Sequence, residues 1–262
     1  MSVRAEDGTG GAGLPRRGWS GLLIALTFLT VLPLPRSLAR QDFDLGDAAP
    51  WFPLVGGVVG GAAGTVRVGL DPLLGRGPSS ALAILGLILA TGALHQDGVA
   101  DVADALGVRG DRPRRMAVMR EATIGAFGGI ALTVWALVLY ACLDGLSAQH
   151  ALRALVCAAA TGRLAALLHA RLAAPARRDG LGVRLRVGPL RLALALALAA
   201  AIAVAGAGPL RAGLSLAACA LIAVLGAALA RRAFGGSTGD TLGATIAVSE
   251  LTVCLALLAS WR

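Results

Sequence analysis

Long apolar stretches separated by short polar segments recur along the whole chain. Most approach the ~20 residues that a helix needs to cross a membrane, and none shows the strict alternation expected of a membrane β-barrel. The pattern therefore predicts an all-α, polytopic integral membrane bundle of about eight apolar helices, one of which could be re-entrant. The expected helices cover residues 19–34, 50–70, 79–94, 123–143, 151–172, 190–207, 210–230 and 241–261.

The same pattern predicts two regions. Residues 1–17 are Gly-rich and polar, and we expect a disordered tail there. Residues 18–262 are expected to form one transmembrane catalytic domain. The first apolar run ends at Pro33 and Pro35 without a small-residue cleavage site, which favours a retained helix over a removable signal peptide.

Composition supports the membrane assignment and excludes other classes. The chain is 56% hydrophobic and 15% charged, with a mean hydropathy of +0.75. Its net charge of +9 comes from arginines between the apolar runs, a pattern typical of topology signals and phosphate contacts. Aromatic residues make up 4%, too few for base-stacking platforms, so we expect no nucleic-acid partner.

The loop arginines also predict orientation. With eight spans, the loops after the first, third, fifth and seventh helices lie on one side. These loops, counted together with Arg171 at the end of the fifth helix, carry 14 of the 24 arginines. The excess of positive charge predicts that this side faces the cytoplasm. Within it, residues 105–122 are basic and contain Met116 and Met119, which suggests a short amphipathic helix along the membrane surface.

One acidic stretch organises the candidate chemistry. It reads T-G-A-L-H-Q-D-G-V-A-D-V-A-D from Thr91, and Asp97, Asp101 and Asp104 share one helical face at i, i+4 and i+7. Three carboxylates on one face repel one another unless a cation lies between them, and Mg²⁺ or Mn²⁺ prefers such oxygen ligands. Solvated charge at a helix start is the simpler explanation, but three acids on one face favour a metal site for phosphoryl transfer.

Two neighbours of this cluster have candidate roles. His95 titrates naturally near neutrality, so it could carry a proton, ligate the metal or hold an aspartate in place. Gly98 would leave the backbone open to an approaching phosphate.

The last polar loop, G-G-S-T-G-D from Gly235, leads into the final helix. Its amides could hold phosphate while Asp240 joins the metal shell, although a Gly-rich turn with Asp240 as a helix cap is an equal alternative. Glu250 falls in mid-membrane, where it either pairs with a buried arginine (Arg163 or Arg67) or lines the site.

A combination of motifs identifies a family. The chain resembles the cobalamin synthases (adenosylcobinamide-GDP ribazoletransferases), membrane enzymes late in coenzyme B12 assembly, from about residue 26 to residue 250. The resemblance rests on F-L-T-V-L-P-L-P from Phe28, W-F-P-L-V-G from Trp51, the acidic stretch from Thr91, M-R-E-A-T-I-G-A-F-G from Met119, R-R-D-G-L-G from Arg177 and T-G-D-T-L-G-A from Thr238.

The resemblance implies a reaction and its participants. The 5′-hydroxyl of α-ribazole, or its 5′-phosphate, would attack the cobinamide-linked phosphate of adenosylcobinamide-GDP and release GMP, with Mg²⁺ as cofactor. The enzyme would lie in the plasma (inner) membrane with a cytoplasmic active face. Association with other cobalamin-assembly enzymes, or into homo-oligomers, would be compatible with this location. The implied site residues are His95, Asp97, Asp101 and Asp104 for catalysis, Asp97, Asp101, Asp104 and Asp240 for the metal, and Arg120, Arg177, Arg178 and Gly239 for substrate phosphate.

Two other functions are weighed against this one. A CDP-alcohol phosphatidyltransferase would share the reaction type, but its pattern, similar to D-G-x-x-A-R followed by G-x-x-x-D-x-x-x-D, has no second half here. A transporter would place acids near the bilayer midplane and show an inverted repeat, and no repeat is evident in this sequence.

Overall fold

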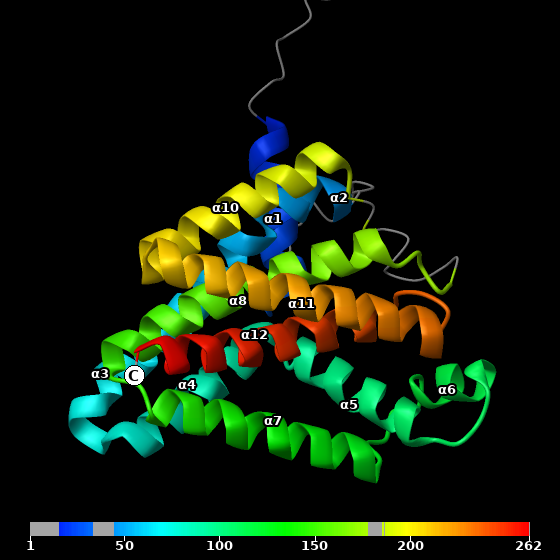
Figure 1. Ribbon diagram of the computed structural model, residues 1–262, viewed down its shortest axis with the longest axis horizontal. Coiled ribbons are helices and arrows are strands. Elements are labelled where there is room, and N and C mark those ends of the chain that lie inside the picture. The colour runs from blue at the N-terminus through cyan, green and yellow to red at the C-terminus, as the bar shows by residue number, and fades with distance from the viewer. Residues whose placement is uncertain (1–15, 34–44, 178–184, 186, 262) are drawn as a thin grey trace, which may run out of the picture.

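The computed structural model describes residues 16–33, 45–177, 185 and 187–261, and this part of the chain is helical. Most of the long helices run side by side in one bundle (Figure 1). The helices are α1 (Arg16–Leu29), α2 (Leu45–Ala48), the 3₁₀ turn η1 (Ala49–Trp51), α3 (Phe52–Leu74), α4 (Arg76–Thr91), α5 (Leu94–Gly107), α6 (Arg112–Val118), α7 (Ala126–Asp144), α8 (Ala148–Leu172), α10 (Pro189–Ala207), α11 (Pro209–Ala233) and α12 (Gly239–Trp261).

Six of the described helices are long and apolar enough to cross a membrane: α3 with the short helices before it, α7, α8, α10, α11 and α12. Their outward faces carry many exposed leucines and valines, which a bilayer would cover. The prediction of an all-α integral membrane bundle is confirmed. The predicted number of eight apolar helices is approximate, for two reasons.

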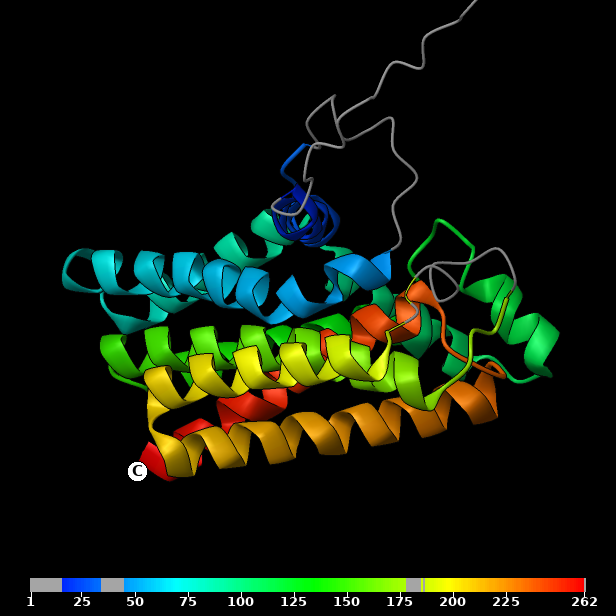
Figure 2. The ribbon, with the colours of Figure 1, turned by 90° about the horizontal axis from the view of Figure 1, so that it is seen from above.

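The first predicted helix is too short to span. It ends at Leu29, and its apolar part, Ser20–Leu29, would cover only about 15 Å of a ~30 Å hydrocarbon core. It lies across the bundle, so that Figure 2 shows it end-on while its neighbours run along the page. The third predicted helix is also interrupted, because α4 and α5 meet at an angle of 91°.

Glycine lets α3 approach α8, the most enclosed helix of the bundle. A Cβ at Gly56 or Gly60 would collide with the backbone carbonyls of Ala159 and Leu155, respectively. Gly56 and Gly60 therefore act as the small residues that allow a close helix–helix contact.

The polar connections before α7, after α8 and before α12 meet at one end of the bundle (Figure 1). The Ala176 amide donates to the Ser237 carbonyl at 2.9 Å, and the Ser237 amide donates to Ala174 at 2.8 Å. α6, which corresponds to the predicted surface helix, lies beside them and is capped by Asp111. Three of the four predicted arginine-rich loops therefore share this end; Arg36 and Arg40, in the fourth, lie outside the described residues, as does the tail up to residue 15.

Candidate active site

The acidic helix α5 begins directly after the sharp bend. Gly92 and Ala93 both have left-handed backbone conformations, with φ of 61° and 59°. Glycine adopts this conformation freely, whereas in alanine it costs on the order of 1 kcal/mol, which the surrounding packing must offset. The bend directs α5 along α7 and α12, and it places His95 and Asp97 in the first turn of α5.

A close helix crossing brings the fourth acid to this helix. A Cβ at Gly98 of α5 would lie 2.5 Å from the Asp240 carbonyl oxygen, and a Cβ at Gly243 of α12 would lie 3.2 Å from the Leu94 carbonyl. Gly98 is therefore filled by α12, and the prediction that it leaves room for a phosphate is wrong. Its absent side chain instead allows Asp240 to approach the acids of α5.

The crossing creates an electrostatic conflict centred on Asp101, whose helix is not one of the six spanning segments. Partial burial, followed by repulsion from Asp97, Asp240 and Asp104, raises the pKa of Asp101 to about 7. Ionising Asp101 is costly because other carboxylates lie close to it. A bound cation would reduce that cost.

The donor set fits a magnesium ion that keeps part of its coordination for water and substrate. Among the described residues, no three His, Cys, Asp or Glu side chains already converge as a metal-binding group. Mg²⁺ is usually held by one or two carboxylates together with waters and substrate phosphates. Asp97 and Asp240 both line one small cavity and are the best placed to share such an ion.

Asp104 has a different role from its two neighbours. Its Oδ2 accepts a hydrogen bond from the Gly125 amide at 2.7 Å, and its Oδ1 accepts one from the Gly128 amide at 2.8 Å. The carboxylate therefore caps the N-terminus of α7, where amides are otherwise unpaired and negative charge is favoured. A Cβ at either glycine would collide with this side chain. Metal ligation by Asp104 stays a prediction, while its structural role is clear.

His95 is almost fully buried, and its Nε2 has no hydrogen-bond partner among the described residues. Burial and the nearby positive charge of Arg163 lower the pKa of this imidazole well below its usual value. A neutral ring beside a cation is a poor proton acceptor. Of the predicted roles, orienting a hydroxyl or an aspartate fits this environment better than general-base catalysis.

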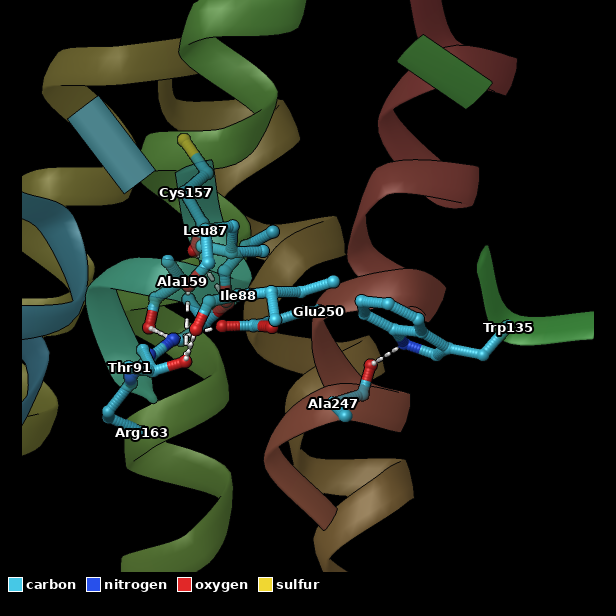
Figure 3. Close-up of polar contacts among 11 residues, drawn as sticks. Leu87, Ile88, Thr91, Trp135, Cys157, Ala159, Arg163, Ala247 and Glu250 are labelled. Atoms are coloured by element: carbon cyan, nitrogen blue, oxygen red, sulfur yellow. Dashed lines mark hydrogen bonds and ion pairs between the residues drawn. The ribbon is translucent and has the colours of Figure 1, made fainter. Parts of the chain in front are cut away.

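Glu250, whose role the sequence left open, forms an ion pair with Arg163 inside the bundle (Figure 3). Arg163 also donates to the Ala159 carbonyl at 3.3 Å and is fully buried. The pair joins α8 to α12 close to His95, so Glu250 has a structural role next to the site. Arg67, the other arginine considered as a partner for Glu250, is also buried, but it is paired with Asp71 and bonded to Ser79 at 2.9 Å.

The Gly-rich loop before α12 has little capacity left for phosphate. The Ser237 amide is bonded to Ala174, the Thr238 amide to the Thr241 hydroxyl, and the Thr241 amide to the Thr238 hydroxyl. Thr238 therefore caps α12, and the alternative that Asp240 does so is wrong. Asp240 is left in the first turn, where it accepts a 3.3 Å bond from Thr238. Gly239, a predicted phosphate contact, lines the same cavity as Asp97.

A groove of about 450 Å³ lies beside the acids and is lined by three arginines, Arg112, Arg120 and Arg177. Arg177 exerts a favourable charge interaction on Asp240 and donates to the Met116 carbonyl at 3.4 Å. The buried Nε of Arg177 has no hydrogen-bond partner within the described part of the chain. Two of the three arginines predicted to contact phosphate thus share one groove, and Arg178 lies outside the described residues.

Sequence reasoning missed two polar contributors. Arg112 was grouped only with the loop charges, yet its guanidinium packs where a side chain at Gly235 would be. The absence of a side chain at Gly235 is the sequence feature that permits this contact, and Gly235 lies more than a hundred residues from Arg112. His169 is not among the predicted site residues, yet its Nδ1 lies 2.8 Å from the Thr245 hydroxyl and joins α8 to α12.

Comparison with known proteins shows the family to which the chain belongs. The sequence profile of a family described as Cobalamin-5-phosphate synthase matches residues 21–258. An adenosylcobinamide-GDP ribazoletransferase of Mesorhizobium japonicum is 38% identical, covering 92% of this chain and 93% of its own length. One from Klebsiella pneumoniae subsp. pneumoniae is 39% identical, covering 89% and 97%, and one from Azorhizobium caulinodans is 35% identical, covering 89% and 93%. No solved structure matches the chain.

Proposed function

The chain belongs to the cobalamin-5-phosphate synthase family, and we propose that it is an adenosylcobinamide-GDP ribazoletransferase that uses Mg²⁺. A free ribose hydroxyl oxygen of α-ribazole, or of its 5′-phosphate, forms a bond to the phosphorus that carries the cobinamide. The 5′-oxygen of the 5′-phosphate is already esterified, so the attacking group is a ribose hydroxyl other than the expected 5′-hydroxyl. The bridging P–O bond of the diphosphate breaks, and GMP leaves with the bonding electrons. The products are adenosylcobalamin, or its 5′-phosphate, and GMP, with the hydroxyl proton released to solvent.

The observation that carries this proposal is the α5–α12 crossing, which gathers Asp97, Asp101 and Asp240 beside an arginine groove. Phosphoryl transfer needs little covalent help from a protein; it needs positioned charge. A magnesium ion would neutralise the phosphate oxygens as the bond to GMP breaks.

In this proposal each group of site residues has its own role. Asp97, Asp101 and Asp240 would hold Mg²⁺, and His95 would orient the attacking alcohol. Arg112, Arg120 and Arg177 would bind the diphosphate and retain the negative charge of the departing GMP. Asp104 would keep α7 in register with α5, so its contribution to the metal would be indirect.

The location of the site follows from the same charges. The end of the bundle that carries the arginine groove is rich in positive charge, which supports a cytoplasmic active face in the plasma membrane. Soluble nucleotide-activated substrates would reach it there. Association with other cobalamin-assembly enzymes, or into homo-oligomers, stays a prediction.

The direct experiment uses purified protein in lipid nanodiscs with adenosylcobinamide-GDP, α-ribazole and Mg²⁺. Equal amounts of cobalamin product and GMP are expected, and none when EDTA replaces Mg²⁺. A CDP-alcohol with diacylglycerol-type acceptors should give no product, which separates this enzyme from a phosphatidyltransferase. Absence of cobalamin with substrates that a known relative converts would refute the proposal.

A further inference from the structure

A second cavity shares no lining residue with the arginine groove. It has a volume of about 100 Å³ and is lined by residues of α1, α3, α5, α8 and α12 together with Leu185. Its polar lining is limited to His95, Asp97 and Asp240 and backbone groups, while the rest of its wall is apolar and includes Phe28 and Phe52. None of the described residues that line it is basic, so we assign the diphosphate to the arginine groove instead.

The wall of this cavity is suited to a flat aromatic ligand. The rings of Phe28 and Phe52 are stacked, with centroids 5.8 Å apart and an interplanar angle of 23°. Phe52 and Leu29 are fully buried, so this side of the cavity is fixed by packing. A closed apolar cavity of roughly 150 Å³ lined by such side chains can hold benzene. A smaller cavity that opens on one side can hold one end of a fused ring system.

One polar atom at this cavity lacks a partner. His95 lines it, and the buried Nε2 of His95 makes no hydrogen bond within the described part of the protein. A buried polar atom without a partner costs about 1–3 kcal/mol, unless a ligand or water completes it. A ligand with an apolar ring and one in-plane nitrogen would satisfy both features of the cavity.

We propose that this cavity binds the dimethylbenzimidazole base of α-ribazole. The inference rests on the transferase function proposed above and adds the acceptor's binding site. The methylated benzene ring lies against Phe28 and Phe52, the unsubstituted ring nitrogen faces His95, and the ribose emerges between Asp97 and Asp240. A free ribose hydroxyl is then directed at the phosphate that carries the cobinamide.

The two cavities give the reaction a direction. Asp240 lines the apolar cavity and also interacts electrostatically with Arg177 of the arginine groove. The acceptor alcohol therefore approaches from the side of α1, and GMP departs toward α6. An in-line displacement needs attacking and leaving oxygens on opposite sides of the phosphorus. The arrangement also predicts selectivity, because an apolar wall cannot pair the exocyclic amino group of a purine nucleoside.

Filling the cavity tests the proposal. Ile246→Phe adds an aromatic ring to the cavity wall, whereas Leu225→Phe places the same ring in a separate apolar cavity between α11 and α12. We expect Ile246→Phe to raise the KM for α-ribazole by about tenfold or more, since steric loss in a pocket is worth ~1–3 kcal/mol. The KM for adenosylcobinamide-GDP should be unchanged, and Leu225→Phe should behave as wild type.

A milder variant and a binding assay keep the test decisive if Ile246→Phe folds poorly. Phe28→Leu keeps an apolar side chain but removes one ring, and a KM for α-ribazole about three- to tenfold higher is expected. Equilibrium dialysis of α-ribazole into protein-loaded nanodiscs, without Mg²⁺ and against empty nanodiscs, measures binding alone. Free dimethylbenzimidazole should compete, and adenosine should not.

Failure of this proposal is distinct from failure of the function. An active wild-type enzyme whose KM for α-ribazole is unaffected by both substitutions would overturn the base-binding site and leave the transferase intact. Equal increases in both KM values would also overturn it. If the wild type makes no cobalamin, the transferase proposal fails, and α-ribazole binding that is absent or unaffected by Ile246→Phe would then reject the cavity as well.

Discussion

Gly98 of α5 lies directly against Asp240 of α12, so closely that a Cβ at position 98 would be 2.5 Å from the Asp240 carbonyl oxygen. The two residues are 142 positions apart in the chain. Their contact makes one acidic cluster from α5, which carries three aspartates, and the first turn of α12, which carries the fourth.

Enlarging residue 98 should therefore separate the acids. In Gly98→Ala the backbone of one helix must shift, which we expect to cost about 1–3 kcal/mol of stability. The rate of GMP release should fall by more than the loss of folded protein accounts for. Thermal unfolding and GMP release, measured on the same nanodisc samples, give both values. Gly129→Ala is the matched control, because a Cβ there meets nothing within 4 Å. Wild-type activity in Gly98→Ala would argue against the crossing.

Removing the cap on α7 should destabilise the protein whether or not metal is present. Asp104→Ala leaves the Gly125 and Gly128 amides without their acceptor, and hydrogen bonds to a charged group are worth about 1.5–3 kcal/mol. Asp104→Asn keeps an acceptor oxygen and should lose less. A lowered melting temperature in EDTA is the expected result. If Asp104→Ala melts normally in EDTA and loses only its Mg²⁺ response, the residue is a ligand and not a cap.

Stability should depend on pH through Asp101. Because the pKa of Asp101 is raised to about 7 in the folded protein, the folded state binds a proton that the unfolded state releases between about pH 4 and pH 7. Its contribution to stability in EDTA therefore falls as pH rises across that range. Asp101→Asn should flatten this dependence. Mg²⁺ should raise the melting temperature more at pH 8 than at pH 6, since metal and proton compete for the carboxylate; equal effects would contradict this.

A substitution in the arginine groove should weaken the binding of adenosylcobinamide-GDP alone. Arg112→Ala should raise the KM for adenosylcobinamide-GDP about tenfold, because a charge-assisted contact to phosphate is lost, and leave the KM for α-ribazole unchanged. Arg76→Ala, at an exposed position at the start of α4, is the control for a change in overall charge. Steady-state kinetics with each substrate varied in turn distinguishes these outcomes. Identical effects of the two substitutions would remove Arg112 from the site.

Much of this fold could be predicted from the sequence, because a long apolar run in a membrane has few alternatives to forming a helix. The interruption between α4 and α5 was not predictable to the same degree. Ala93 has the left-handed backbone, and alanine carries no local signal for it. Only packing against distant elements maintains that conformation.

The site was predicted in part for similar reasons. Asp97 and Asp101 were found from helical spacing, which is a local property. The cap formed by Asp104 links residues 21 and 24 positions apart, so its spacing within α5 suggested a metal ligand instead. Gly98 was misjudged because a glycine that admits a ligand and one that admits a helix look alike in sequence. The apolar cavity depends on α1, whose crosswise position no periodicity reveals.

The central claim is that Asp97 and Asp240, from two different helices, hold the same magnesium ion during transfer. The most direct measurement is the Mg²⁺ dependence of GMP release by Asp97→Asn, Asp240→Asn and the wild type, with Glu121→Gln as an exposed acidic control. We expect both aspartate variants to need at least about tenfold more Mg²⁺ for half-maximal rate, or to be inactive, and the control to match the wild type. A wild-type Mg²⁺ curve in Asp240→Asn would contradict the account.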